Sequence, residues 1–263
     1  MLFKIGDLVS RNSYNNDTLF KITSIEEGIV NLKGVDVRLY ADSPPSDLRL
    51  EKGDSLLDDD ELFIDEINQN IRLDRNEFFY LPGKILHIDG DDEYLERCIN
   101  FYKKMKVKAY ALKLKEEVIS MDIERYLKKL KPDIVVITGH DFFYKNRKDI
   151  NNINNYRNSK FFVDAIKKAR EYEKSQDKLV IIAGACQSDY EDLIKSGANF
   201  ASSPKRINIH ALDPAIIAAS IALASRDKPI DIVKIVSRTK YKEDGMGGII
   251  TAGMMYRGYP RWT

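Results

Sequence analysis

The sequence has few cysteines, histidines and tryptophans: 2 Cys, 3 His and 1 Trp in 263 residues. Cys98 and Cys186 fall in segments of different predicted type, which excludes a disulfide framework and favours a reducing compartment. The three histidines are scattered and show no metal-ligand spacing with the cysteines. We therefore expect neither a metal site nor a cofactor.

The sequence also lacks an excess of charge of either sign and any long apolar run. Lys and Arg number 42 against 41 Asp and Glu, so the net charge is +1 and gives no basic footprint for nucleic acid. No run reaches the roughly eighteen apolar residues that a membrane span requires, and the start MLFKIGDLVSRN lacks a signal-peptide core. We expect a soluble protein that stays inside the cell.

What is present first is a β-rich start. The stretches KIGDLVSR, LFKITSIEEGIVNLKG and VDVRLYADSPPSDLRL are short β-type runs separated by Gly and Pro, which predicts a small SH3-like β-barrel over residues 1–50. Residues 51–78 are acidic and polar, and we interpret them as a helical or partly disordered linker. Residues 79–263 then form a separate α/β domain.

Strands and helices alternate in that second domain. Apolar runs at 84–89, 107–114, 133–139 and 178–183 predict strands, and 92–105, 122–130 and 159–175 predict helices. Ser188 and Glu191 form a capping-box pattern, which predicts a further helix from 188 to 197. This alternation predicts an α/β fold with a mostly parallel sheet and helices on both faces.

Three reactive side chains follow predicted strands: Asp89, His140 and Cys186. Functional groups collect beyond the carboxyl ends of parallel strands, so we expect the three to lie near one another. A helix N-terminus and an imidazolium would both lower the pKa of the Cys186 thiol, and His140 could act as its general base. Their order and spacing are close to the roughly fifty-residue His-before-Cys spacing of caspases.

The remaining candidates have mainly structural interpretations. Cys98 lies inside a predicted amphipathic helix and His87 inside a predicted strand, so both are expected to pack in the core. His210 either lines the site or caps the helix that begins at DPAIIAAS. The glycine-rich DGMGGIITAG is either a flexible loop or hairpin that closes over substrate, or a plain turn.

Two motifs resemble the caspase-like cysteine peptidases: an apolar block that ends in glycine and His140, and one that ends in Ala185 and Cys186. A fuller similarity is to the YabG family of sporulation proteases, over IGDLVSRNSYNNDTLFKI, VRLYADSPPSDL, PGKILHIDGDDEYLERCINFYKK, PDIVVITGHD, AGACQSDYEDLIKSGANFASSPKRINIHALDP and GMGGIITAGMMYRG. The resemblance implies a caspase-like fold and a cysteine endopeptidase of the mother-cell cytoplasm, associated with the forming spore coat. Its partners would be spore coat and spore-morphogenetic proteins, cut after arginine.

Residue by residue, the resemblance makes Cys186 the nucleophile and His140 the general base. Backbone groups of Gly139, Asp141 and Ala185 would hold the oxyanion, although the caspase-like group usually has glycine where Asp141 stands.

The acid that binds the substrate arginine has to be found elsewhere, because Gly184 occupies the position where several arginine-cleaving relatives carry an acidic residue. We interpret Asp89 as that acid, with Asp91 and Asp92 as substitutes, since a buried carboxylate can bind a guanidinium through two hydrogen bonds. The alternative is that Asp89 caps the helix DDEYLERC.

Two other functions stay open at this point. GACQS imitates the strand-to-helix elbow of class I glutamine amidotransferases, but that enzyme type needs a histidine farther downstream than His210. A non-catalytic adaptor, with the barrel as its binding module, would make His140 and Cys186 dispensable.

Overall fold

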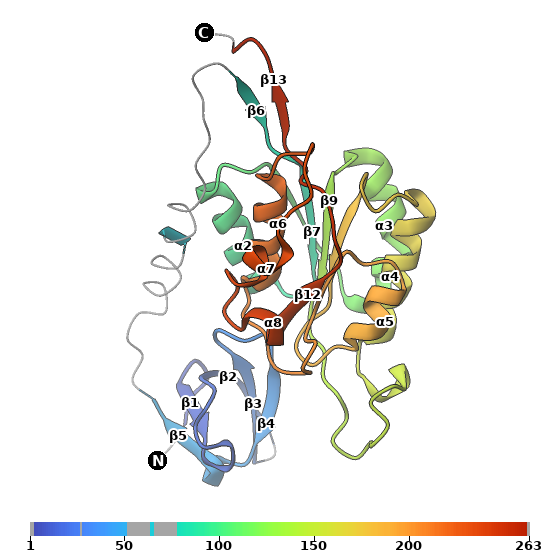
Figure 1. Ribbon diagram of the computed structural model, residues 1–263. Helices are drawn as coiled ribbons and strands as arrows, with labels where there is room; N and C mark the ends of the chain where they lie inside the picture. The colour runs from blue at the N-terminus through green and yellow to red at the C-terminus, as the bar shows by residue number, and fades with distance from the viewer. Residues whose placement is uncertain (1–2, 27, 52–63, 66–77, 262–263) are drawn as a thin grey trace.

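The computed structural model describes residues 3–26, 28–51, 64–65 and 78–261. In these parts the chain forms a five-stranded antiparallel sheet, a six-stranded mixed sheet with helices on both sides, and a two-stranded ribbon (Figure 1). The linker predicted over 51–78 lies almost entirely outside the described residues.

The five-stranded sheet is formed by strands between Leu8 and Leu50. Its strands are β1 (Leu8–Arg11), β2 (Phe20–Glu26), β3 (Ile29–Gly34), β4 (Tyr40–Ser43) and β5 (Leu48–Leu50), in the order β4-β3-β2-β1-β5. Alternate residues of β2 and β3 face inward, so Phe20, Ile22, Val30 and Leu32 are almost completely buried, while Lys21 and Ile29 between or beside them are exposed. This period of two is the pattern of a sheet with one face on a core.

The six-stranded sheet has the order β12-β11-β10-β9-β7-β8. Its strands are β7 (Ile85–Asp89), β8 (Ala109–Lys113), β9 (Ile134–Thr138), β10 (Val180–Ala183), β11 (Phe200–Ser202) and β12 (Met246–Gly248). All neighbours are parallel except β12, which runs antiparallel to β11. The prediction of a mostly parallel sheet is confirmed. The ribbon pairs β6 (Phe79–Leu81) with β13 (Tyr256–Gly258).

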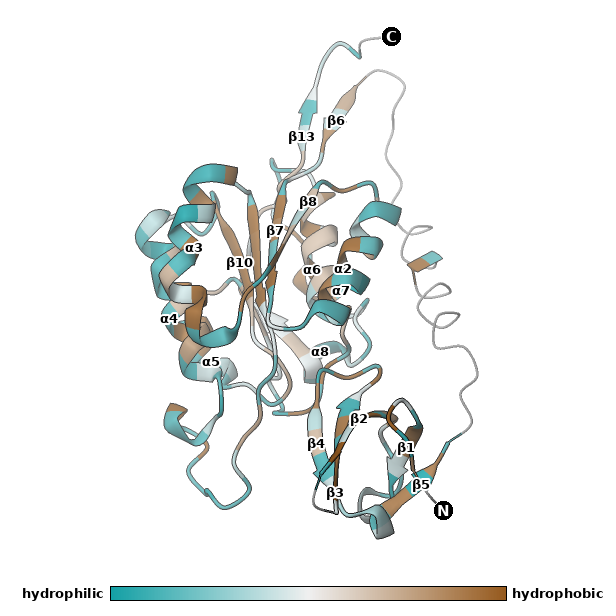
Figure 2. Ribbon diagram, turned by 180° about the vertical axis from the view of Figure 1, so that it is seen from behind, coloured by the Kyte–Doolittle hydropathy of each residue, from teal (hydrophilic) through white to brown (hydrophobic). Residues whose placement is uncertain are grey.

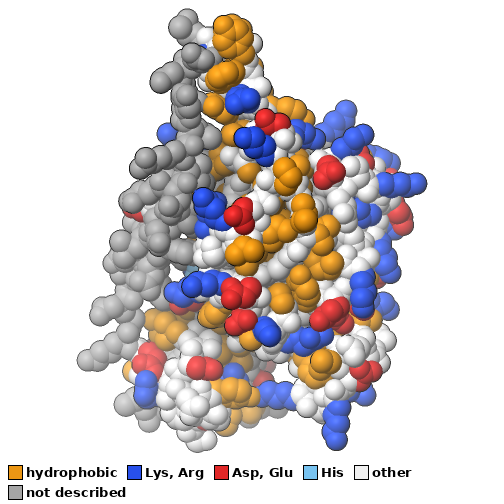
Figure 3. All heavy atoms as spheres, viewed as in Figure 1, with side chains coloured by type: hydrophobic (Ala, Val, Ile, Leu, Met, Phe, Trp, Pro, Cys, Tyr) orange, Lys and Arg blue, Asp and Glu red, His pale blue; other side chains and the backbone are white. Residues whose placement is uncertain are grey.

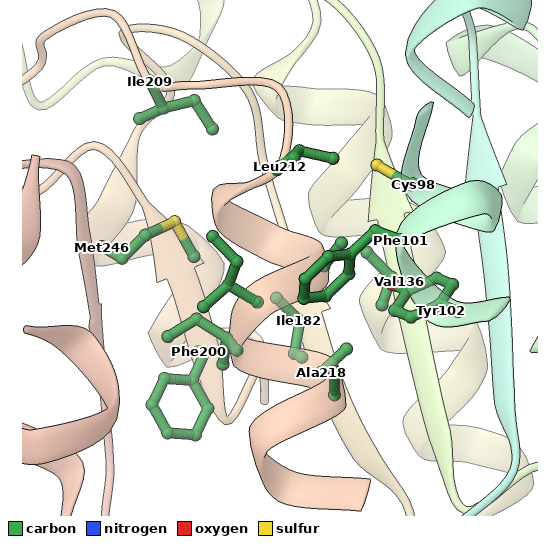
Figure 4. Close-up of a cluster of buried hydrophobic side chains, with 14 of the residues drawn as sticks. Cys98, Phe101, Tyr102, Val136, Ile182, Phe200, Ile209, Leu212, Ala218 and Met246 are labelled. Carbon is green, nitrogen blue, oxygen red and sulfur yellow. The ribbon is translucent and has the colours of Figure 1, made fainter. Parts of the chain in front are cut away.

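Helices cover both faces of this sheet (Figure 1). One face carries α2 (Asp92–Lys104), α6 (Asp213–Ala222) and α7 (Ile232–Val236), and the other carries α3 (Glu116–Leu130), α4 (Ser159–Tyr172) and α5 (Tyr190–Lys195). The strands between them are apolar, whereas the outer helix surfaces are polar (Figure 2). Under α2 and α6 the core packs Phe101, Val136, Ile182 and Phe200 together (Figure 4). The short helix α8 spans Lys242–Gly245.

The capping-box prediction at Ser188 was wrong. Helix α5 begins at Tyr190, and Asp189 caps it by accepting a hydrogen bond from the backbone N–H of Asp192. The Ser188 hydroxyl instead donates to Asp141 and accepts from the N–H of Ala185. Tertiary contacts across the sheet edge therefore override a local helix signal.

The centre of DGMGGIITAG is an edge strand and not the flexible loop, closing hairpin or plain turn that the sequence suggested. Met246–Gly248 forms strand β12, which pairs with β11 at the edge of the sheet. Glycine is required here because a Cβ on Gly248 would lie 2.4 Å from the ring of Phe200. Met246–Gly248 is therefore held in the sheet, and residues 249–253 lie beyond the strand.

The five-stranded sheet lies at the end of the six-stranded sheet where the parallel strands finish (Figure 1). On the face seen in Figure 3, acidic and basic side chains are interspersed without a large area of one sign. Among the described residues, no helix is long and apolar enough to cross a membrane.

Candidate active site

The site lies where the strand order of the large sheet reverses. Strand β7 pairs with both β8 and β9, so the chain leaves β7 toward one side and later returns to the other. In open parallel sheets this reversal leaves a crevice beyond the carboxyl ends of the strands. Asp89 ends β7, His140 follows β9 and Cys186 follows β10, as expected from the sequence.

Cys186 lies in the turn between β10 and α5. Gly184 allows this turn because its φ is +110° and a Cβ there would lie 2.3 Å from the hydroxyl of Ser202. The Cys186 thiol is fully buried and accepts a hydrogen bond from the N–H of Ile209 at 3.3 Å. Burial raises the pKa of the thiol to about 12, although the N–H groups of Ile209 and Arg38 act in the opposite direction. The expected lowering of this pKa is therefore absent in this state.

The imidazole of His140 is held by Asp91. Nε2 lies 3.3 Å from Oδ2 of Asp91, and the ring packs against Tyr40 and Tyr94 with centroids 4.2 and 5.6 Å away. Nδ1 is buried and has no hydrogen-bond partner among the described residues. A carboxylate at one ring nitrogen and a second nitrogen without a hydrogen-bond partner are the arrangement of an oriented general base.

The backbone of His140 is fixed on both sides. Its N–H donates to Oε1 of Glu116 at 2.7 Å, and its carbonyl accepts from the Asn158 side chain at 2.7 Å. Glu116 begins α3 and presses on Gly139, where a Cβ would lie 2.2 Å from Oε1. Glu116 escaped the sequence analysis because it opens a helix whose start was predicted later, at residue 122.

Asp141 connects the loops after β9 and β10. Its buried carboxylate accepts hydrogen bonds from Ser188 Oγ at 2.9 Å, from the N–H of Asn158 at 2.7 Å and from Ser159 Oγ. Burial raises the pKa of Asp141 to about 6, against the hydrogen bonds, which lower it. No hydrogen bond joins Cys186 to His140 in the described structure, so Asp141 and the register of β9 with β10 set their relative position.

Asp91 caps α2 and belongs to a network of its own. Besides His140, its carboxylate accepts from the N–H of Tyr94 and from the hydroxyl of Tyr40 at 3.1 Å, and it pairs with Lys33 at 2.8 Å. Burial would raise the pKa of Asp91, but these donors and the Lys33 charge hold it well below its usual range. Asp92, the other substitute for the arginine-binding acid, is exposed and pairs with Lys113.

Asp89 is completely buried and ion-paired with Arg38 of the five-stranded sheet. Its carboxylate also accepts from Thr138 Oγ1 at 2.6 Å and from the N–H of Asp91 at 2.9 Å. Burial opposes the charge of both partners, yet the pair keeps the pKa of Asp89 well below and that of Arg38 well above their ordinary values. The alternative role of Asp89 as a helix cap is wrong, because Asp91 caps α2.

The other histidines and Cys98 are structural in this state. His87 is buried between Tyr102 and Thr138, with hydrogen-bond distances of 2.9 and 3.0 Å. Nδ1 of His210 accepts from the N–H of Leu212, and burial lowers the pKa of His210 to about 3. Cys98 packs in α2 as expected, but its Sγ also lies 3.5 Å from Nη2 of Arg38.

The family model "YabG peptidase U57" matches residues 4–260. The chain belongs to the YabG peptidase family. The sporulation-specific protease YabG of Bacillus subtilis (strain 168) is 42% identical to it over 286 residues, which cover 99% of this chain and 99% of the relative.

Membership of the YabG family identifies the chain as a peptidase, so its partners include protein substrates. The matched region contains the loops after β7, β9 and β10 together with the five-stranded sheet. The resemblance to the YabG family that the sequence motifs indicated is confirmed.

Proposed function

We propose that the protein is a caspase-like cysteine endopeptidase that processes spore coat and spore-morphogenetic proteins during sporulation by cutting after arginine. The sporulation role is carried over from the Bacillus subtilis relative, which is named a sporulation-specific protease. The proposal extends to its place of action, the mother-cell cytoplasm and the forming spore coat. It also treats residues 1–50 as an SH3-like module and 79–263 as the peptidase domain.

One observation carries the cysteine mechanism. His140 has one ring nitrogen held by Asp91 and the other without a hydrogen-bond partner among the described residues, on the strand that neighbours the one leading to Cys186. A thiol next to an oriented imidazole is the chemistry of acyl transfer to cysteine.

In the proposed reaction His140 takes the thiol proton as Cys186 attacks the carbonyl carbon of the substrate arginine. Formation of the C–S bond gives a tetrahedral oxyanion. The C–N bond then breaks, and the imidazolium returns the proton to the leaving amine. Water then attacks the thioester, His140 accepts its proton, and the thiol is regenerated with a free carboxylate on the product. Asp91 stays ionised and stabilises the imidazolium.

Backbone N–H groups of Gly139 and Asp141 are the proposed oxyanion donors. Ala185 was the third candidate, but its N–H donates to Ser188 Oγ at 2.9 Å in this state. It could join the oxyanion hole only after Ser188 is displaced.

An open cleft of about 770 Å³ adjoins the site and can hold peptide beyond the cut. It lies between the five-stranded sheet and the loop after β9, and Leu39, Tyr40, Phe142 and Gln187 are among the residues that line it. Because the cleft is open, we predict that the enzyme acts on extended segments of proteins.

The decisive experiment is cleavage of an arginine-containing spore protein by the purified chain and by Cys186→Ala. We expect cleavage after arginine by the first and none by the second, with both folded by circular dichroism. Met121→Ala is the control, because it removes an exposed sulfur-containing side chain of α3. Equal cleavage by Cys186→Ala and the unmodified chain would rule out the thiol mechanism.

A further inference from the structure

The segment that connects β3 to β4 in the five-stranded sheet lies inside the candidate site. Val37 and His210 form an antiparallel bridge, in which the N–H of Arg38 donates to the carbonyl of Ile209 at 3.3 Å and the N–H of Ala211 donates to the carbonyl of Asp36 at 2.8 Å. Addition of an extended segment to an exposed backbone edge is a common way for proteins to bind peptides. Residues 209–211 thus already bind one extended segment, supplied by the chain itself.

The side chain of Arg38 fills a closed pocket. It is 0% exposed, pairs with Asp89, and donates through Nε and Nη2 to the carbonyl of Ala211 at 3.2 and 2.9 Å. A carboxylate and a backbone carbonyl that converge on a guanidinium are what a substrate arginine would need. Cys98 Sγ completes the contacts of Nη2.

The same segment passes the two reactive groups. Ile209, which accepts from Arg38, also donates its N–H to the thiol of Cys186. After Arg38 the chain turns sharply, because the N–H of Leu39 donates to the carbonyl of Val37 at 2.8 Å. Tyr40 then packs on the ring of His140. Arg38 thus places its side chain in a pocket and its backbone beside the thiol, and Tyr40 lies beside the imidazole. A bound peptide substrate would follow the same course.

We propose that residues 209–211 form the substrate-binding edge of the enzyme and that the segment 36–38 between β3 and β4 occupies it as a built-in substrate mimic, with Arg38 in the pocket for substrate arginine. This proposal rests on the proposed function, because it identifies the subsites of that peptidase. The chain as folded is then only weakly active, because substrates reach Asp89 and Cys186 only while this segment is displaced.

A purely structural ion pair between Arg38 and Asp89 makes a different prediction. Removing Arg38 would then only destabilise the fold and would create no new binding site. Under the mimic proposal the same change opens a pocket with a defined ligand, an arginine preceded by an extended backbone. Peptide binding in trans therefore separates the two interpretations.

The first experiment measures binding without catalysis. The peptide amide Asp-Val-Arg is titrated by calorimetry into Cys186→Ala and into the double variant Cys186→Ala/Arg38→Ala, with Asp-Val-Gln amide as the control ligand. We expect binding to the double variant at least tenfold tighter than to Cys186→Ala, and no such gain for the glutamine peptide. Equal binding to both chains, or binding to neither, would overturn the mimic.

Arg38→Lys provides a variant whose fold is preserved if Arg38→Ala fails to fold, since it keeps a cation beside Asp89 while losing the guanidinium fork. It should raise peptide affinity less than Arg38→Ala but above the unmodified chain; no gain in a folded Arg38→Lys would contradict the proposal. Arg49→Lys, an exposed site in the same sheet, is the matched control.

The second experiment measures cleavage of an arginyl fluorogenic peptide with Cys186 intact. We expect kcat/KM at least tenfold higher for Arg38→Ala than for the unmodified chain. Equal and measurable rates would overturn the mimic while leaving the peptidase intact. No cleavage by any variant, together with the expected binding result, would overturn the cysteine mechanism but not the occupied edge.

Discussion

At the scale of single residues, Asp91 determines how His140 is presented. Its carboxylate is the partner of Nε2, and it is itself fixed by the start of α2, by Lys33 and by Tyr40. We expect Asp91→Asn to lower kcat by on the order of a hundredfold or more with little change in KM, because an amide can donate to Nε2 and select the wrong tautomer.

The measurement for Asp91→Asn is steady-state kinetics on an arginyl peptide, in the Arg38→Ala background if the intact chain is too slow. Asp92→Asn is the control, because Asp92 is exposed and pairs only with Lys113 among the contacts shown. A fall in kcat of similar size in both variants would deny Asp91 its orienting role.

Asp141 makes the stability of the fold depend on pH. Burial raises its pKa to about 6 from an ordinary value of 3.8, so the folded chain binds more protons than the unfolded chain between these values. This contribution is fully present below the unfolded pKa and is lost as pH rises through the folded pKa. Asp141→Asn removes the titration and keeps hydrogen-bond partners for Ser159 and Ser188, whose hydroxyls can turn to accept.

Urea unfolding of both chains at pH 4.5 and pH 7 tests this prediction. Relative to Asp141→Asn, the unmodified chain should lose free energy of unfolding on the order of 2 kcal/mol across that range. Parallel pH profiles of the two chains would show that Asp141 does not titrate there.

At the scale of secondary structure, the contact between α3 and the end of β9 determines where His140 lies. Glu116, at the start of α3, packs on Gly139 and accepts from the N–H of His140. A methyl group on Gly139 would overlap this carboxylate, so Gly139→Ala should cost about 1–3 kcal/mol of stability and most of the activity.

A double variant isolates this contact. Glu116→Ala removes the overlapping atoms, so Gly139→Ala/Glu116→Ala should be more stable than the sum of the single effects by at least about 1 kcal/mol. Activity should stay low, because the N–H of His140 has lost its acceptor. Strict additivity in thermal unfolding would locate the strain elsewhere.

Elements and their order were largely predictable, whereas their contacts across the chain were not. Buried apolar runs and amphipathic helices have local periodicity, which is why the parallel sheet and the positions of Asp89, His140 and Cys186 after its strands followed from sequence. The Ser188 signal failed because its hydroxyl finds Asp141 in another loop. The roles of Arg38 and Glu116 depend on partners far away in sequence, and no local pattern marks them.

At the scale of the whole molecule, the buried pair of Arg38 and Asp89 joins the two sheets. Arg38→Ala alone should lower the free energy of unfolding by about 3–5 kcal/mol, because it leaves a buried carboxylate without its counter-charge. Arg38→Leu/Asp89→Leu should cost less than Arg38→Ala, since it removes both charges.

Chemical denaturation of these variants, with Arg49→Ala as an exposed control, measures both effects. If Arg38→Ala proves as stable as the unmodified chain, the pair does not hold the sheets together. The peptide-binding experiments above are independent of this result, because they compare affinities of folded chains.

The segment 36–38 is part of the same chain as the binding edge that it occupies. This tether gives the segment a high effective concentration at that edge. A segment attached through a short, ordered connection competes as though it were present at millimolar levels. A dilute protein with a suitable arginine would rarely displace it, whereas a densely packed array of substrate chains would. The enzyme would then respond to the local crowding of its substrates and begin to cut where they have already assembled.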